Sequence, residues 1–213
     1  PYFQEALFFP YADGADFISH LKGTGGFKPV TGIYKDLPRS SEQILHPEKY
    51  STRRDDPTPV ALPLKLDGWT QVHNDVLGEL VFRVLMSGFL DVDRAQTIAE
   101  GWDGDRYRAF QKKKGAGYSG TLVVLRTAWD TPDDAKEFFE GYAAIVLEKY
   151  DGATKAPAPK KAPPSSDAFA HFSTSETVPT VVQIERRGSE VLVIDGAPND
   201  ETASSVRKKA WGG

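Results

Sequence analysis

The spacing of apolar residues changes from helical in the first half of the chain to strand-like in the second half. Apolar side chains that recur every three or four residues form one face of an amphipathic helix. This pattern, with capping and breaking residues, predicts helices over residues 4–22 with a break near Pro10, 27–34, a short turn after Ser40, 75–85, 91–100, 131–150 and 199–211. Thr131, Pro132 and Asp134 give the clearest start, as a cap, a first-position proline and an acid three residues after the cap.

Two hairpins are predicted in the second half. Residues 106–111 and 118–129 are typical of strands joined by a lysine- and glycine-rich turn, and the apolar run 122–125 is typical of a central strand. Residues 180–186 and 190–194 flank a second turn and predict the other hairpin. Residues 60–62 are compatible with an edge strand.

Together these patterns predict an α+β fold. We expect a helical region over residues 1–103, then a mainly antiparallel α+β region over residues 104–213, with the 131–150 helix packed on the sheet. Residues 151–167 are rich in Pro, Ala, Lys and Ser. Such a segment has too little apolar surface to offset its ordering entropy, so it is expected to be an exposed, mobile loop.

Composition excludes several classes of protein. The chain has 213 residues, with 26 basic and 30 acidic side chains and a net charge of −4, which argues against a general nucleic-acid binder. No apolar run is long enough to span a bilayer. Cysteine is absent, which excludes disulfides, thiol catalysis and Cys-based zinc sites. The numbered chain begins at Pro1 without signal-peptide character, which favours a processed product or an excised piece.

The densest group of candidate chemistry lies in residues 40–50. Ser40 and Gln43 have the spacing of a capping box, and Pro47 limits the helix to one or two turns. On one helix, Glu42 and His46 would share a face, so that the carboxylate fixes the imidazole tautomer and His46 moves protons or orients a carbonyl. Alternatively, these residues and Tyr50 cap and pack the helix.

Metal and nucleophile signatures are weak elsewhere. The four histidines are scattered, so no zinc site is predicted within this chain. The acids of residues 99–107 lack the spacing of a calcium loop and instead indicate a helix-to-strand turn, with Gly101 at the helix end and Arg106 paired to an acid. The chain has no Gly-x-Ser-x-Gly elbow and no phosphate-binding loop.

Several segments, in order, resemble the C-terminal half of secreted bacterial zincin-type metallopeptidases. They are residues 9–11, 14–17, 25–27, 41–50, 77–79, 101–107, 129–131 and 134–135. That family carries a zinc-binding His-Glu-x-x-His helix before such a block, and this chain has none. The resemblance therefore implies the non-metal-binding portion of a zinc-dependent peptidase, which shapes the substrate cleft.

The same resemblance implies the partners and the location. His46, Glu42 and Tyr50 would be helper groups beside the cleft, and zinc would come only with the upstream part of the precursor. That part would be the partner, a peptide the substrate, and the location extracellular or periplasmic. The chain alone is expected to be inactive and without a cofactor. The competing interpretation is a non-catalytic binding or structural module derived from a peptidase fold.

Overall fold

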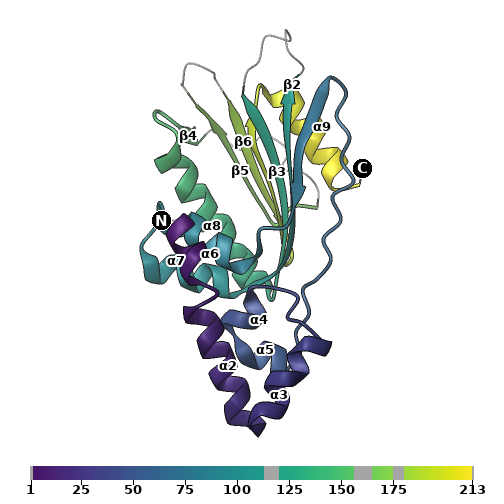
Figure 1. Cartoon of the computed structure of the whole chain (residues 1–213). Helices are drawn as coiled ribbons and strands as arrows, with labels where there is room; N and C mark the ends of the chain where they lie inside the picture. Colours follow the sequence, from purple (N-terminus) through teal and green to yellow (C-terminus); the bar gives the residue numbers. More distant parts are fainter. Residues whose placement is uncertain (1, 113–119, 156–164, 175–179, 213) are drawn as a thin grey trace.

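The computed structural model describes residues 2–112, 120–155, 165–174 and 180–212, and its centre is one antiparallel sheet. The strands are β1 Trp69–Asp75, β2 Trp102–Lys112, β3 Thr121–Trp129, β4 Thr154–Lys155, β5 Ala168–Ser173, β6 Val181–Arg187 and β7 Glu190–Ala197. They pair in the order β1-β2-β3-β7-β6-β5-β4, so β3 and β7 lie inside the sheet (Figure 1).

Helices cover both faces of the sheet and also project beyond one end of it. The helices are α1 Tyr2–Phe8, α2 Ala12–Gly25, α3 Phe27–Gly32, the 3-10 turn η1 Ile33–Lys35, α4 Glu42–Leu45, α5 Pro47–Ser51, α6 Gly78–Ser87, α7 Val92–Glu100, α8 Pro132–Lys149 and α9 Asp200–Ala210. In Figure 1, α6, α7 and α8 lie on one face and α9 on the other, while α2–α5 extend below the sheet.

Each face of the sheet has its own apolar core. The core under α6–α8 contains the stacked rings of Trp129 and Phe138, with Phe82 edge-on to both. The core under α9 is smaller, and two of its buried side chains, Leu62 and Leu64, come from the segment between α5 and β1, which is neither helix nor strand. Because strands of the central sheet bury both faces, their sequences are nearly continuously apolar rather than alternating.

The predicted α+β class is confirmed, as are both hairpins and the helices, except that the helix expected from residue 75 begins at Gly78 because Asp75 ends strand β1. The caps follow the predicted chemistry: Thr131 Oγ1 accepts from the backbone N–H of Asp134, and Asp91 Oδ1 accepts from that of Asp93. Asn199, the first residue of the predicted 199–211 helix, caps it by accepting from the N–H of Thr202 through Oδ1.

The structure corrects the prediction in four places. β1 forms within the region expected to be helical and pairs with β2, and β5 was not predicted. Residues 60–62 are extended but form no strand. Part of the expected 151–167 loop, Thr154–Lys155, is strand β4 paired with β5, while residues 156–164 lie outside the described ranges. The predicted turn at 112–117 also falls mostly outside them.

Residues 57–66, which we call the strap, cross the sheet and connect the helices at its end with β1. The N–H of Thr58 donates to the carbonyl of Asp103 at 2.7 Å, and Arg108 Nη1 donates to the carbonyl of Leu64 at 2.9 Å. Gly104 permits this approach, because a Cβ at that position would lie 2.2 Å from the Thr58 carbonyl oxygen. The strap thus borders β2 at the point where the candidate site begins.

Candidate functional site at the end of the sheet

Polar residues in and next to α4 and α5 attach the helical segment, defined here as α2–α5 (residues 12–51), to the rest of the fold. Ser41 makes the first attachment, since its Oγ accepts from the backbone N–H of Leu80 in α6 at 3.2 Å. This hydroxyl satisfies one of the N–H groups that the first turn of a helix leaves without an internal partner. Sequence reasoning did not assign Ser41 a role, because the N–H group that donates to it lies far along the chain.

His46 makes the second attachment through a buried acid. Its Nε2 lies 2.9 Å from Oε1 of Glu79, in the first turn of α6. The other oxygen, Oε2, is buried and has no hydrogen-bond partner among the described residues, so His46 is what offsets the burial of this carboxylate. The hydrogen bond with Glu79 raises the pKa of His46, against the lowering effect of burial.

The expected placement of Glu42 and His46 on one helix is wrong. α4 ends at Leu45, and His46 has φ −121° and ψ 78°, outside the helical region. Pro47 is the cause, because its ring disfavours helical geometry in the preceding residue while it suits the first position of α5. The break turns His46 towards Glu79.

Lys49 makes the third attachment by placing one ammonium among three carboxylates. Its Nζ lies 2.6 Å from Glu42 Oε1, 2.8 Å from Asp130 Oδ2 and 3.4 Å from Asp55 Oδ2. These carboxylates have one oxygen each within 4.8 Å of one another, a spacing that could hold a metal ion. The ammonium already provides the positive charge there, so we interpret the group as an ion-pair clamp, which we call the Lys49 clamp.

Burial and charge act in opposite directions within the Lys49 clamp. Glu42 is only 1% exposed, and burial raises its pKa to about 7, although the hydrogen bond from Lys49 lowers it. Burial lowers the pKa of Lys49, but its hydrogen bonds to Asp130 and Glu42 outweigh that effect and the net pKa is raised. Burial also raises the pKa of Asp130. The lysine therefore stays charged, while Glu42 titrates near neutrality.

Tyr50, the third candidate from the sequence, lies inside the helical segment. Its hydroxyl donates to the backbone carbonyl of Asp36 at 2.6 Å. Its ring meets the edge of Phe17 at a centroid distance of 5.2 Å, and the guanidinium of Arg54 lies 4.9 Å from the ring centroid. These contacts hold α2 against α5 and give Tyr50 a packing role.

Gln43 organises the loop that leads to the strap. Its side chain is fully buried, with Oε1 accepting from the N–H of Arg39 and Nε2 donating to Oδ1 of Asp56 at 3.0 Å. Its own N–H donates to Ser40 Oγ at 3.3 Å, as the capping-box spacing predicted. In a full capping box, the Gln43 side chain would accept from the N–H of Ser40. Here it accepts from the N–H of the preceding residue, Arg39.

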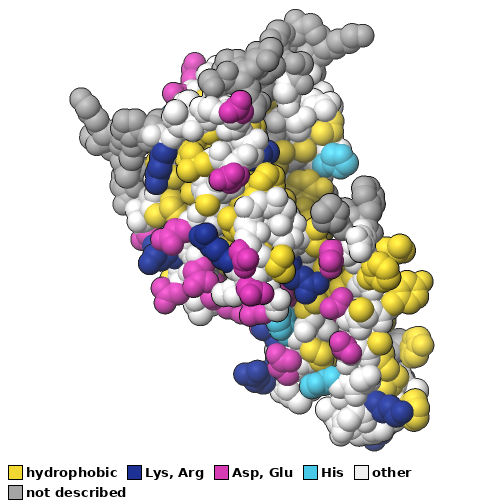
Figure 2. Space-filling model, turned by 90° about the vertical axis from the view of Figure 1, so that its left-hand side faces the viewer, with side chains coloured by type: hydrophobic (Ala, Val, Ile, Leu, Met, Phe, Trp, Pro, Cys, Tyr) yellow, Lys and Arg dark blue, Asp and Glu magenta, His cyan; other side chains and the backbone are white. Residues whose placement is uncertain are grey.

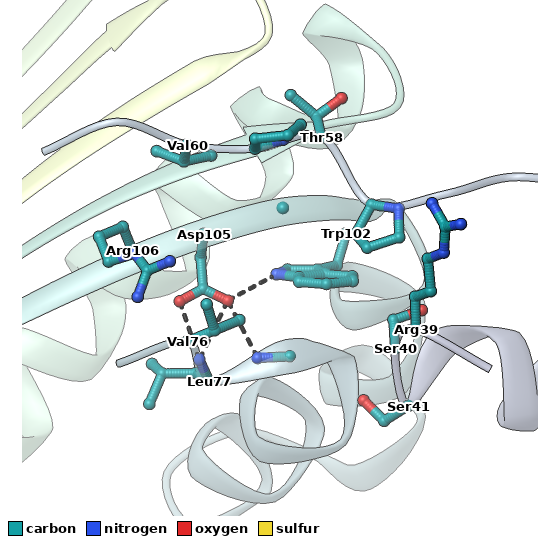
Figure 3. Close-up of a pocket in the computed structure, with 14 residues that line it drawn as sticks. Arg39, Ser40, Ser41, Thr58, Val60, Val76, Leu77, Trp102, Asp105 and Arg106 are labelled. Atoms are coloured by element: carbon teal, nitrogen blue, oxygen red, sulfur yellow. Dashed lines mark hydrogen bonds between the residues drawn. The ribbon is translucent and has the colours of Figure 1, made fainter. Parts of the chain in front are cut away.

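A cavity of about 380 Å³ opens where the helical segment, the strap, α6 and β2 meet (Figure 3). It is lined by Arg39, Ser40, Ser41, Pro57, Thr58, Pro59, Val60, Val76, Leu77, Gly78, Trp102, Gly104, Asp105 and Arg106. His46, Glu42 and Tyr50 are not among these lining residues. Several residues of the 101–107 segment line the cavity instead, although sequence reasoning interpreted this segment only as a turn.

Asp105 organises one wall of this cavity. It is 3% exposed, and its carboxylate accepts from the N–H groups of Leu77 and Gly78 and from Trp102 Nε1 (Figure 3). Burial raises the pKa of Asp105, while the hydrogen bonds from Gly78 and Leu77 lower it. The carboxylate thus caps α6 and fixes the indole, which confirms a structural role for part of the 101–107 segment.

Comparison with known proteins places most of this structure in one family. A family model described as "Domain of unknown function (DUF8575)" matches residues 65–207, which cover the sheet, α6–α8 and most of α9 and leave the helical segment outside. No curated protein matches the chain. Among solved structures, the chain is similar to the extracellular domain of PknH from Mycobacterium tuberculosis, with 10% identity, a TM-score of 0.45, and coverage of 73% of this chain and 96% of that chain.

The raised pKa of Glu42 predicts a pH-dependent clamp. Between its ordinary value of 4.5 and about 7, the folded protein binds this proton more tightly than the unfolded chain, so the free energy of unfolding falls as pH rises through that window. The raised pKa of His46 acts in the same direction above its ordinary value of 6.5. We expect Glu42→Gln to flatten the profile by on the order of 2 kcal/mol between pH 5 and 8.

Urea unfolding of both proteins across this pH range measures the effect. Since Gln keeps the size of the side chain and removes the titration, parallel profiles for the two proteins would contradict the burial-driven shift of Glu42.

Proposed function

The chain belongs to the family described as a domain of unknown function (DUF8575), and because that description names no activity, we propose its function from the structure: a non-catalytic module that docks against another polypeptide. The observation that carries this proposal is an exposed apolar surface on the first helices and the loop that follows them. Its large exposed side chains are Leu7, Phe8, Tyr11, Ile18, Phe27, Tyr34 and Leu37. Figure 2 shows hydrophobic side chains gathered along one edge of the part that contains α2 and α3.

The aromatic side chains of this apolar surface are strongly exposed to solvent. Tyr34 is 86% exposed, and Tyr11 and Phe27 are also mostly exposed. Contiguous exposed apolar side chains of this size mark interaction sites in soluble proteins. Aromatic residues are also enriched where binding energy concentrates. The Lys49 clamp and His46 hold the helical segment in place through polar contacts elsewhere on it. The exposed apolar side chains take no part in these contacts and are available to a partner.

The resemblance to zincin-type metallopeptidases supplies the identity of the partner. On that proposal, the occupant of the apolar surface is the upstream, zinc-binding part of the same precursor, and this chain is the portion that shapes the cleft. The zinc and the general base would belong to the partner, where the metal polarises the substrate carbonyl and activates water. An extracellular or periplasmic location is part of the same proposal. No helix in the described ranges is long and apolar enough to cross a membrane.

A second candidate function makes His46 a helper group in catalysis. It is favoured by one observation: the imidazole is oriented by Glu79 and keeps 24% of its side-chain surface exposed. The hydrogen bond with Glu79 raises the pKa of His46, which favours the imidazolium, and a positioned imidazolium can stabilise an oxyanion. The contacts of Glu42 and Tyr50 support the docking function instead, because both side chains are engaged within the segment.

The docking proposal predicts that acidic substitutions on the apolar surface abolish complex formation. We expect Phe27→Asp and Tyr34→Asp each to weaken binding of the upstream polypeptide by roughly thirtyfold or more, the scale of losing an interface hot spot. Folding should be unaffected, since both side chains are exposed. Isothermal titration calorimetry measures the affinity. Val92→Asp on α7 is the matched control, because Val92 is also exposed and lies outside this surface.

The docking proposal would be contradicted if the unmodified chain does not bind the upstream polypeptide, or if the control weakens binding as much as the two surface variants.

The two candidate functions differ in what His46→Ala does to the assembled protein. If His46 only attaches the helical segment, turnover of a casein substrate should be unchanged, while the melting temperature falls because Glu79 loses its partner. If His46 is a helper group, turnover should fall by roughly a hundredfold with little change in stability. We expect the first result, and the second would favour catalysis.

A further inference from the structure

The cavity at the junction contains a positive charge that the fold leaves without a close partner. Arg106 lines it and is half-buried, and its guanidinium makes no hydrogen bond or ion pair with any described residue. Its charge attracts the carboxylate of Asp105 and lowers the pKa of that group, without a hydrogen bond or ion pair between the two. Since a guanidinium offers five donors, a half-buried one without an acceptor is well placed to bind a ligand.

Asp105 does not compete for this guanidinium at short range. Both of its oxygens already accept hydrogen bonds, from Leu77, Gly78 and Trp102. The positive end of the α6 dipole also lies against the carboxylate and offsets its charge. Figure 3 shows the carboxylate turned towards these donors, with Arg106 beside it and Arg39 beyond Trp102. A cationic ligand would therefore find no free carboxylate oxygen on Asp105.

The remaining walls of the cavity are apolar or offer hydroxyl groups. Val60, Val76 and Leu77 contribute aliphatic surface, and the prolines of the strap have no N–H to donate. Arg39 lies at the far end, where Asp56 already engages it at 2.8 Å. A volume of about 380 Å³ falls within the range of small-molecule sites.

We infer that this cavity binds a small organic carboxylate with an apolar body. The carboxylate pairs with the guanidinium of Arg106, and the body lies along Val60, Leu77 and the indole of Trp102. Arg106 is the specificity-determining residue, because a planar guanidinium matches a carboxylate in a two-pronged hydrogen-bonded geometry. None of the lining residues belongs to the apolar docking surface, so the ligand and a docked polypeptide occupy different places.

The test uses N-acetyl-leucine as the probe, with N-acetyl-leucinamide and isoamylamine as its neutral and cationic counterparts. Binding is followed on the unmodified chain through the indole N–H resonance of Trp102 in two-dimensional nitrogen–proton spectra. We expect the acid to shift this resonance with saturation, and to bind at least roughly tenfold more tightly than the amide or the amine, the scale of one charge-assisted pair.

Variants then assign the charge to one residue. Arg106→Gln should weaken binding of the acid by roughly tenfold and leave binding of the amide unchanged. Arg53→Gln is the matched control, since it removes an exposed arginine that follows the helical segment, does not line the cavity and should have no effect.

Equal affinity for acid and amide, tighter binding of the amine, or no shift of the Trp102 resonance would each overturn the inference. The comparison of the three probes on the unmodified chain gives this answer even if Arg106→Gln does not fold. Unchanged binding of the acid by a folded Arg106→Gln would overturn it as well.

Discussion

The position of the helical segment depends on one ammonium group held among three carboxylates. Lys49 joins α5 to Glu42 of α4 and to Asp130, which lies between β3 and α8. Burying such charges is costly unless each has a close partner of opposite sign. The arrangement therefore stabilises only one placement of the segment, the one in which all these groups meet. His46 and Ser41 add contacts to α6 that fix its orientation.

Two surfaces of different chemistry follow from this placement. Where the segment meets the strap and β2, it closes one side of the cavity that contains Arg106. Away from the sheet, its helices expose the aromatic side chains that a larger core would have buried. The polar groups of residues 40–50 thus hold the helical segment in position. The side chains available to a ligand or a partner are those of the cavity and of the apolar surface.

Local features of the fold could be predicted from the sequence, because the signals lie within a few residues. The cap at Thr131, the break at Pro47 and the apolar run 122–125 each act through their immediate neighbours. β1 was missed because it is an edge strand with one partner and largely exposed side chains, so it carries no apolar alternation. β5 was missed because its partner, β6, was already assigned to the hairpin with β7.

The candidate site could be predicted only in part, because the sequence shows which polar residues are adjacent but not which distant residues they contact. Sequence reasoning found the block that holds Glu42, His46 and Tyr50, since its polar residues are adjacent. It could not find their partners, because His46 and Glu79 are 33 residues apart and Lys49 and Asp130 are 81 apart. Arg106 was expected to pair with an acid, but the neighbouring Asp105 is engaged by α6 and Trp102.

A double-mutant cycle between Lys49 and Asp130 tests most directly whether the Lys49 clamp holds the segment to the sheet. Lys49→Met, Asp130→Asn and the double variant would be unfolded in urea at pH 7. The account predicts a favourable coupling energy of roughly 1–3 kcal/mol, within the range for partners in one salt-bridge network. Additive effects of the two substitutions, with coupling below about 0.3 kcal/mol, would contradict it.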